Sequence, residues 1–173
     1  MNKLWLIGIA LFIWSCEGQP QKKDLTKILT KKERFEISQN SLKQVLEKEQ
    51  SQIKKFIQRK GGSFTESQTG VHYFIYSKEN NQKYPVAGNR LSVQYGLKLL
   101  NGVEIKAKNT TDQITLDYDD KESGLHEILK KMQLKEKAII IIPSHRAHGL
   151  VGNDQDIPPV SSLVYDIQLL SIE

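Results

Sequence analysis

The sequence predicts an α+β fold, in which a curved antiparallel β-sheet wraps on a short helix and an N-terminal amphipathic helix precedes the sheet. Residues 31–60 place apolar side chains at helical spacing with no Pro or Gly to interrupt them. Several short segments after residue 69 are rich in β-branched and aromatic residues, and only residues 123–131 among them have the spacing of a helix. Strands that outnumber one internal helix favour an antiparallel sheet with that helix on one face.

The first sixteen residues have the pattern of a lipoprotein signal. An apolar run over residues 4–14 follows Lys3, and Cys16, the only cysteine among the 173 residues, comes directly after the run and Ser15. Trp14 is bulkier than the residue usual two places before such a cysteine. The position and isolation of Cys16 favour its acylation, against an ordinary signal peptide or an uncleaved anchor.

Acylation of Cys16 would hold the folded body beside a membrane, because more than one acyl chain gives stable anchoring. We expect residues 1–15 to be the signal peptide and residues 16–30 a tether. The expected location is the bacterial cell envelope, with an exported body on the periplasmic side rather than at the cell surface. Without another cysteine that body has no internal disulfide, so its stability depends on its core.

Residues 31–60 are predicted to form a basic amphipathic helix that Gly61-Gly62 ends. Its apolar positions are Leu42, Val45, Leu46, Ile53, Phe56 and Ile57. Residues 19–60 hold twelve Lys or Arg against five Asp or Glu, a net charge of +7, whereas residues 61–173 have a net charge of −2. Three interpretations remain open: the apolar stripe packs on the following domain, the helix dimerises, or its basic face is drawn to an anionic membrane or partner. The oligomeric state is therefore open.

Residues 61–173 are predicted to form one domain. The segments expected as strands are residues 70–76, 91–100, 103–106, 113–116, 139–142 and 163–170. Asn101-Gly102 is a hairpin turn, because both residues tolerate positive φ. The four consecutive isoleucines of residues 139–142 suit a strand buried on both faces or closed off by a helix, and Pro143 ends it. Pro158-Pro159 stiffens the loop that follows and holds Ile157 extended.

The sequence lacks the residue patterns that most kinds of catalysis require. The single cysteine is assigned to lipid, and no Gly-rich phosphate loop is present. The histidines lie at positions without metal-site spacing: His72, His126, His145 and His148. We expect no cofactor and no metal, and an exported chain without a groove-reading motif gives nucleic acid no expected role.

Four segments resemble one known family. IPSHRAHGLVGNDQDIPP, residues 142–159, resembles the IPS-x-x-A-Y-G…(I)PP segment of FKBP-type peptidyl-prolyl cis/trans isomerases. Three other segments follow the family's order. Its first strand pair resembles VQYGLKLLNG, residues 93–102, and its helix resembles SGLHEILKKM, residues 123–132. Its closing strand resembles SLVYDIQLLSIE, residues 162–173. The lipoprotein signal and basic helix upstream further resemble the FKBP-type lipoproteins associated with gliding motility. The resemblance implies an FKBP-like fold for residues 61–173, with proline-containing polypeptides as clients.

Prolyl isomerisation fits a sequence without nucleophiles, because no covalent bond is broken. A catalyst need only favour the twisted amide over the planar one, across a barrier of about 18–20 kcal/mol. The twisted amide is less charge-separated, so an apolar, water-poor pocket and a fixed hydrogen-bond donor assist the reaction.

The resemblance implies four pocket walls. Tyr95 and Tyr165 match wall aromatics of the family, Ile105 stands where an aromatic wall residue is usual, and Leu125 occupies a floor position that is commonly Trp. The two smaller residues are expected to widen the pocket. Lys106 stands where the family usually has Asp, which reverses the charge beside the pocket.

The loop of residues 142–159 supplies two more expected site residues. His148 replaces the tyrosine whose hydroxyl donates to the ligand, and its ring keeps a possible donor at that position. Ile157 falls on the isoleucine whose backbone N–H is expected to donate to the substrate carbonyl. Two functions remain open: a membrane-tethered isomerase that assists folding of envelope or motility proteins, and a non-catalytic FKBP-like binding module of an envelope or motility complex.

Overall fold

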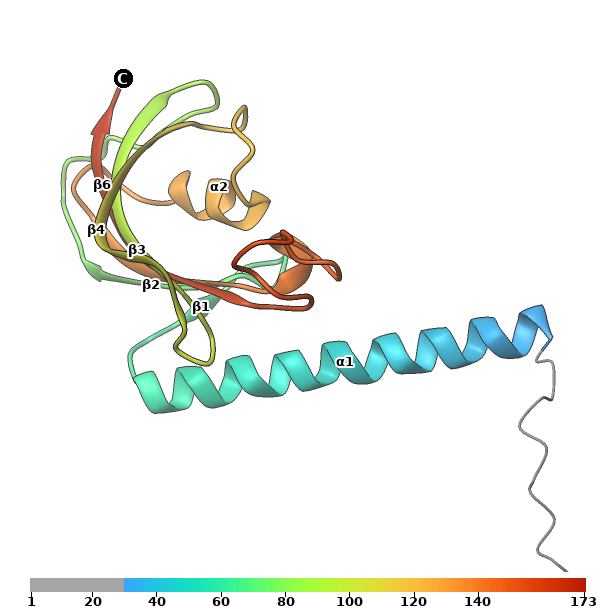
Figure 1. Ribbon diagram of the computed structural model, residues 1–173. Coiled ribbons are helices and arrows are strands. Elements are labelled where there is room, and N and C mark those ends of the chain that lie inside the picture. Colours follow the sequence, from blue (N-terminus) through green and yellow to red (C-terminus); the bar gives the residue numbers. More distant parts are fainter. Residues whose placement is uncertain (1–29) are drawn as a thin grey trace, which may run out of the picture.

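The computed structural model describes residues 30–173 (Figure 1). The expected signal peptide, Cys16 and all of the expected tether before Thr30 lie outside the described residues. Within residues 30–173, none of the helices combines the length and the apolar composition that crossing a bilayer requires.

Six strands form one antiparallel sheet in the described part of the chain. They are β1 (Thr65–Glu66), β2 (His72–Ser77), β3 (Arg90–Leu99), β4 (Glu104–Thr115), β5 (Lys137–Ile142) and β6 (Leu163–Ile172). Their order across the sheet is β1-β2-β5-β6-β3-β4, so β6, the last strand in sequence, lies at the centre between β5 and β3. The helices are α1 (Lys31–Lys60), α2 (Ser123–Leu129) and a short 3-10 turn, η1 (Ser144–Arg146).

The isoleucines of β5 show why the sheet is covered on both faces. Successive side chains of a strand point to opposite faces. Ile140 and Ile142 therefore belong to the main core with α2, whereas Ile139 and Ile141 join a second cluster with Ile53 of α1. The expectation of a strand buried on both faces is confirmed.

The sheet curves around α2, which lies within its concave side (Figure 1). Leu125, Ile128 and Leu129 of α2 are buried in the main core, each at most 1% exposed. The expected fold class, a curved antiparallel sheet on a short helix with an amphipathic helix before it, is confirmed. The helix itself ends at Leu129, two residues earlier than expected.

One strand differs from its prediction. Residues 103–106 and 113–116 were expected as separate strands, but both halves belong to β4 and pair with β3. The pairing steps from Tyr95↔Thr110 to Leu97↔Lys106, and Asn109 takes a left-handed φ of 72° within this bulge. The polar bulge hides the continuity of β4 in the sequence, because it breaks the alternation that marks a strand.

Only the C-terminal half of α1 packs on the domain. Ile53 is fully buried against Ile139, Ile141 and Val164. The N-terminal turns of α1 extend past the body (Figure 1). The interpretation in which the whole apolar stripe packs on the domain does not extend to Val45, which is 39% exposed.

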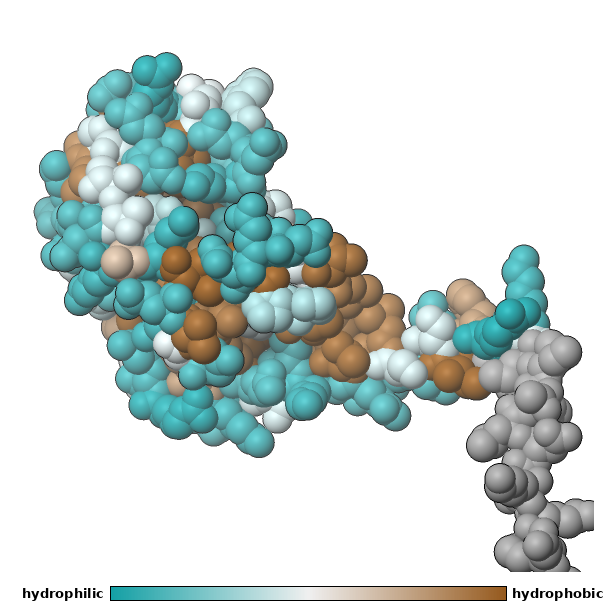
Figure 2. Space-filling view, viewed as in Figure 1, coloured by the Kyte–Doolittle hydropathy of each residue, from teal (hydrophilic) through white to brown (hydrophobic). Residues whose placement is uncertain are grey.

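Apolar surface remains on the rest of α1. Figure 2 shows hydrophobic residues gathered along this helix where the domain does not cover it. Leu42 and Leu46 are half-buried, and Phe35 and Ile37 are exposed. Packing on the domain thus accounts for the end of α1 near Gly61, while dimerisation and partner binding stay open for the remainder.

Candidate active site

The site loop, residues 143–162, connects β5 to β6 beside α2. It begins with η1 and turns back at Gly152, whose φ is 77°. A Cβ atom at Gly152 would lie 2.1 Å from the Ile157 carbonyl oxygen and 2.8 Å from the Pro158 carbonyl carbon. Only glycine therefore permits the close approach that turns Ile157 into the core, where it is 5% exposed.

The structure brings the four expected walls together. Tyr95 on β3 and Tyr165 on β6 pack their rings at a centroid distance of 5.4 Å and an interplanar angle of 47°. Leu125 on α2 belongs to the same buried cluster, and Ile105 on β4 packs against it. Leu125 is only 1% exposed, and the widening expected from Leu in place of Trp stays a prediction.

Glu122 organises the polar side of these walls. Its buried carboxylate accepts a hydrogen bond from the Tyr165 hydroxyl at 2.8 Å, and His148 Nε2 lies 3.2 Å from its other oxygen. A carboxylate can only accept, so Nε2 carries the hydrogen of this contact. Burial, followed by the charge of Glu122, raises the pKa of Tyr165 well above its usual value. The hydroxyl therefore remains a donor, and Glu122 links a wall on the sheet to the partly exposed His148 on the site loop.

A second ion pair lies next to Glu122. Lys121 Nζ is 2.6 Å from Asp112 Oδ2, which joins the start of α2 to β4. The hydrogen bond from Lys121 lowers the pKa of Asp112. Burial opposes the charge on Lys121, but Asp112, Tyr95 and Glu122 together raise its pKa. The neighbourhood of the apolar walls is therefore more charged than the expected site residues alone indicate.

The N–H of Ile157 does not have the expected freedom. It donates to Asn153 Oδ1 at 2.8 Å, and the same oxygen accepts from the N–H groups of Gln155 and Asp156 at 3.1 Å. The expectation that Ile157 offers its N–H to a substrate carbonyl is corrected accordingly: this donor stabilises the site loop.

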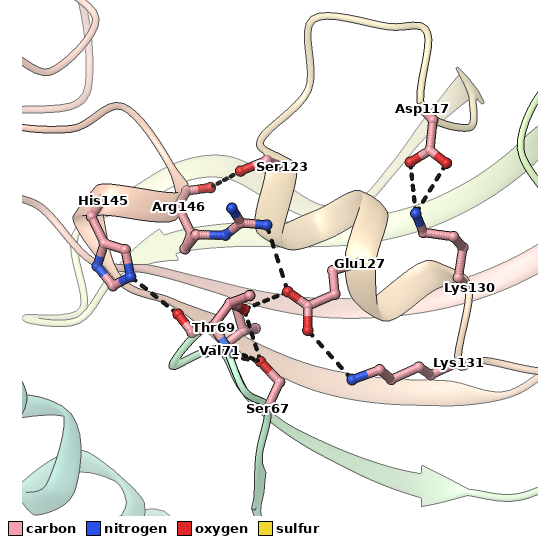
Figure 3. Close-up of polar contacts among 10 residues, drawn as sticks. All are labelled: Ser67, Thr69, Val71, Asp117, Ser123, Glu127, Lys130, Lys131, His145 and Arg146. Atoms are coloured by element: carbon pink, nitrogen blue, oxygen red, sulfur yellow. Dashed lines mark hydrogen bonds and ion pairs between the residues drawn. The ribbon is translucent and has the colours of Figure 1, made fainter.

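A polar network fastens the first part of the site loop to α2 (Figure 3). Glu127 of α2 accepts a short hydrogen bond from Thr69 and lies 3.6 Å from Arg146 Nη2. His145 Nε2 is 3.1 Å from the Thr69 carbonyl oxygen, and Ser123 Oγ donates to the Arg146 carbonyl at 3.2 Å. Hydrogen bonds from Thr69, Ser67 and Lys131 outweigh the burial of Glu127 and lower its pKa, so the carboxylate at the centre of the network is ionised.

The sequence prediction missed the three charged groups beside the walls. Lys121 and Glu122 immediately precede the helix that carries Leu125, and a charged pair before a helix is usually solvent-exposed. Asp112 lies between Thr111 and Gln113, which gives it the appearance of a surface residue. No group of three or more His, Cys, Asp or Glu side chains within residues 30–173 could hold a metal ion.

A curved sheet around one helix, with aromatic and apolar side chains packed together beside a constrained loop, suits a domain that binds its ligand between apolar walls. Residues 81–170 match the model of the family described as FKBP-type peptidyl-prolyl cis-trans isomerase. The chain belongs to this family, and it is a peptidyl-prolyl cis-trans isomerase.

Similar proteins agree with this assignment. A peptidyl-prolyl cis-trans isomerase of Schizosaccharomyces pombe is 31% identical over 106 residues, which cover 60% of this chain and 95% of that protein. The isomerase FKBP11 of Bos taurus is 29% identical over 120 residues, 66% of this chain and 59% of that protein.

Solved structures share the fold. A peptidyl-prolyl cis-trans isomerase of Pseudomonas syringae superposes with a TM-score of 0.66 at 24% identity, covering 76% of this chain and 95% of the other. FkpA of Escherichia coli superposes with a TM-score of 0.61 at 22% identity, covering 84% of this chain and 74% of the other.

Proposed function

We propose that this isomerase is a membrane-anchored lipoprotein that assists the folding of cell-envelope or gliding-motility proteins by isomerising their X-Pro bonds. The observation that carries the anchoring is the lone Cys16 directly after an apolar run. The excess positive charge of residues 19–60, next to that anchor, supports a position close to an anionic surface. The clients are proline-containing polypeptides that fold on the same side of the membrane.

At the site, Tyr95, Tyr165, Leu125 and Ile105 supply apolar surface to a bound proline and exclude water from the amide. An environment of this kind favours the twisted amide, whose charge separation is smaller than that of the planar amide. Glu122 fixes the Tyr165 hydroxyl and the His148 ring before the substrate arrives. Walls held in this way need little rearrangement during the rotation.

The isomerase activity is tested by cis/trans exchange of short peptides in which an apolar residue precedes proline. Uncatalysed exchange takes tens to hundreds of seconds, so modest acceleration is measurable. We expect the protein at micromolar concentration to accelerate exchange. A well-folded protein that leaves the rate unchanged across several X-Pro peptides would instead support the non-catalytic binding module.

Anchoring is tested by the Cys16→Ser variant, which removes the thiol that would carry the acyl chains. We expect fatty-acid labelling and membrane fractionation to find the parent protein acylated and membrane-bound, and the variant unlabelled. Equal labelling of parent and variant would refute the lipoprotein proposal without affecting the isomerase assay.

A further inference from the structure

One carboxylate of α1 is buried against the catalytic domain. Glu49 is 4% exposed. Its Oε1 accepts hydrogen bonds from the Ser144 backbone N–H at 2.7 Å and from Ser162 Oγ at 2.6 Å, and its Oε2 accepts one from Ser144 Oγ at 2.9 Å. A buried carboxylate with three donors is well satisfied, because hydrogen bonds to an ionised acceptor are the strong kind.

The two serines stand at opposite ends of the site loop. Ser144 is its second residue, and Ser162 is its last residue before β6. Glu49 therefore ties the two ends of the loop to each other and to a helix that lies outside the sheet. These are long-range tertiary contacts, because Glu49 precedes Ser144 by 95 residues and Ser162 by 113.

The anchored end transmits its position into the loop through the backbone. The Ser144 carbonyl accepts from the N–H of Gly149 at 2.7 Å, and the Gly149 carbonyl accepts from the N–H of Val160 at 3.2 Å. The first bond closes the segment that contains His148, and the second closes the segment that contains Ile157. Fixing Ser144 thereby limits where both site residues can lie.

We propose that Glu49 is a positioning residue for the isomerase reaction, through which docking of α1 holds the site loop in its working conformation. The inference rests on the isomerase activity of the family and on the placement of the site beneath this loop. It makes α1 a part of the enzyme rather than a spacer between membrane and domain. Without the hydrogen bonds to Glu49, the loop would have to become ordered when the substrate binds. The entropy lost in that ordering would lower the affinity for the substrate.

The test compares two buried carboxylates in the full-length protein. Glu49→Leu removes the carboxylate acceptors and puts an apolar side chain of similar size in their place. Glu136→Leu is the matched control, because Glu136 is 3% exposed and accepts from the N–H groups of Gln133 and Glu79, yet it lies at the opposite end of β5 from the site loop. Both variants are assayed below their melting temperatures, and the rates are normalised to folded protein.

We expect Glu49→Leu to lower kcat/KM for peptide isomerisation by about tenfold, as small displacements of site groups do. Glu136→Leu should leave kcat/KM within about twofold even where it lowers Tm as much, since its carboxylate does not anchor the loop. Glu49→Gln should restore most of the activity, because its amide can still accept from the Ser144 N–H and from Ser162 while donating to Ser144 Oγ.

Hydrogen exchange of the Gly149 and Val160 amides gives a second readout that is independent of turnover. It should accelerate in Glu49→Leu and stay unchanged in Glu136→Leu. If Glu49→Leu does not fold, Ser162→Ala removes a single bond of the anchor and should accelerate exchange at Val160. Parental kcat/KM together with parental exchange would overturn the proposal. A parent without any isomerase activity would refute the assigned activity instead, and the exchange data would still test the anchor.

Discussion

Replacing Ile53 with alanine tests whether α1 is part of the folded unit in solution. Ile53 is 0% exposed and packs against Ile139, Ile141 and Val164 on the outer face of the sheet. Truncating a buried Ile to Ala removes transfer free energy and leaves a cavity, and together these effects cost about 2–5 kcal/mol. For a body of this size each kcal/mol lowers Tm by about 3 °C, so we expect a fall of about 6–15 °C.

Ile37→Ala is the matched control, because it makes the same chemical change on the same helix where the side chain is 52% exposed. The control should shift Tm by no more than about 2 °C, since exposed substitutions change stability by about 0.5 kcal/mol or less. Thermal unfolding followed by circular dichroism measures both. If Ile53→Ala lowers Tm no more than Ile37→Ala does, α1 is not packed on the domain and its proposed anchoring of the site loop fails with it.

Two further predictions address the site and the pH dependence. Tyr165→Ala should lower kcat/KM in the peptide assay by about tenfold, because it removes a wall ring. Tyr165→Phe should keep most of the activity but lower the free energy of unfolding in urea by about 1–3 kcal/mol, since Glu122 loses a buried donor. Equal activity of the two variants would contradict the wall assignment. Burial lowers the pKa of His72, against the attraction of Glu66 and together with the repulsion of Lys54. Below pH 6.5 the unfolded chain then binds more protons than the folded one, so Tm should fall as the pH drops from 6.5 through the lowered pKa. His72→Phe should reduce this fall, and an unchanged pH profile of Tm would refute the assignment to His72.

Local sequence patterns were sufficient for most of the fold. The stripe of apolar residues in residues 31–60 specifies a helix, and Gly61, with φ of 70°, ends it at Lys60. The Asn101-Gly102 turn and the isoleucines of β5 define strands through turn chemistry and side-chain alternation, which act over a few residues. The six expected site residues could be named because the family resemblance carries their spacing, and the structure gathers them around one cluster and the carboxylate beside it.

Tertiary structure alone decided which charged residues are buried and what they hold. Glu49 occupies a position on the apolar stripe four residues before Ile53, a signal that the sequence contains, but its partners Ser144 and Ser162 are named only by the folded chain. No sequence pattern likewise indicates that Glu122 is buried. Its contacts with Tyr165 on β6 and with His148 on the site loop exist only in the folded chain. A buried carboxylate is stable only where donors converge on it, and convergence of residues far apart in the chain is a property of packing that no local pattern encodes.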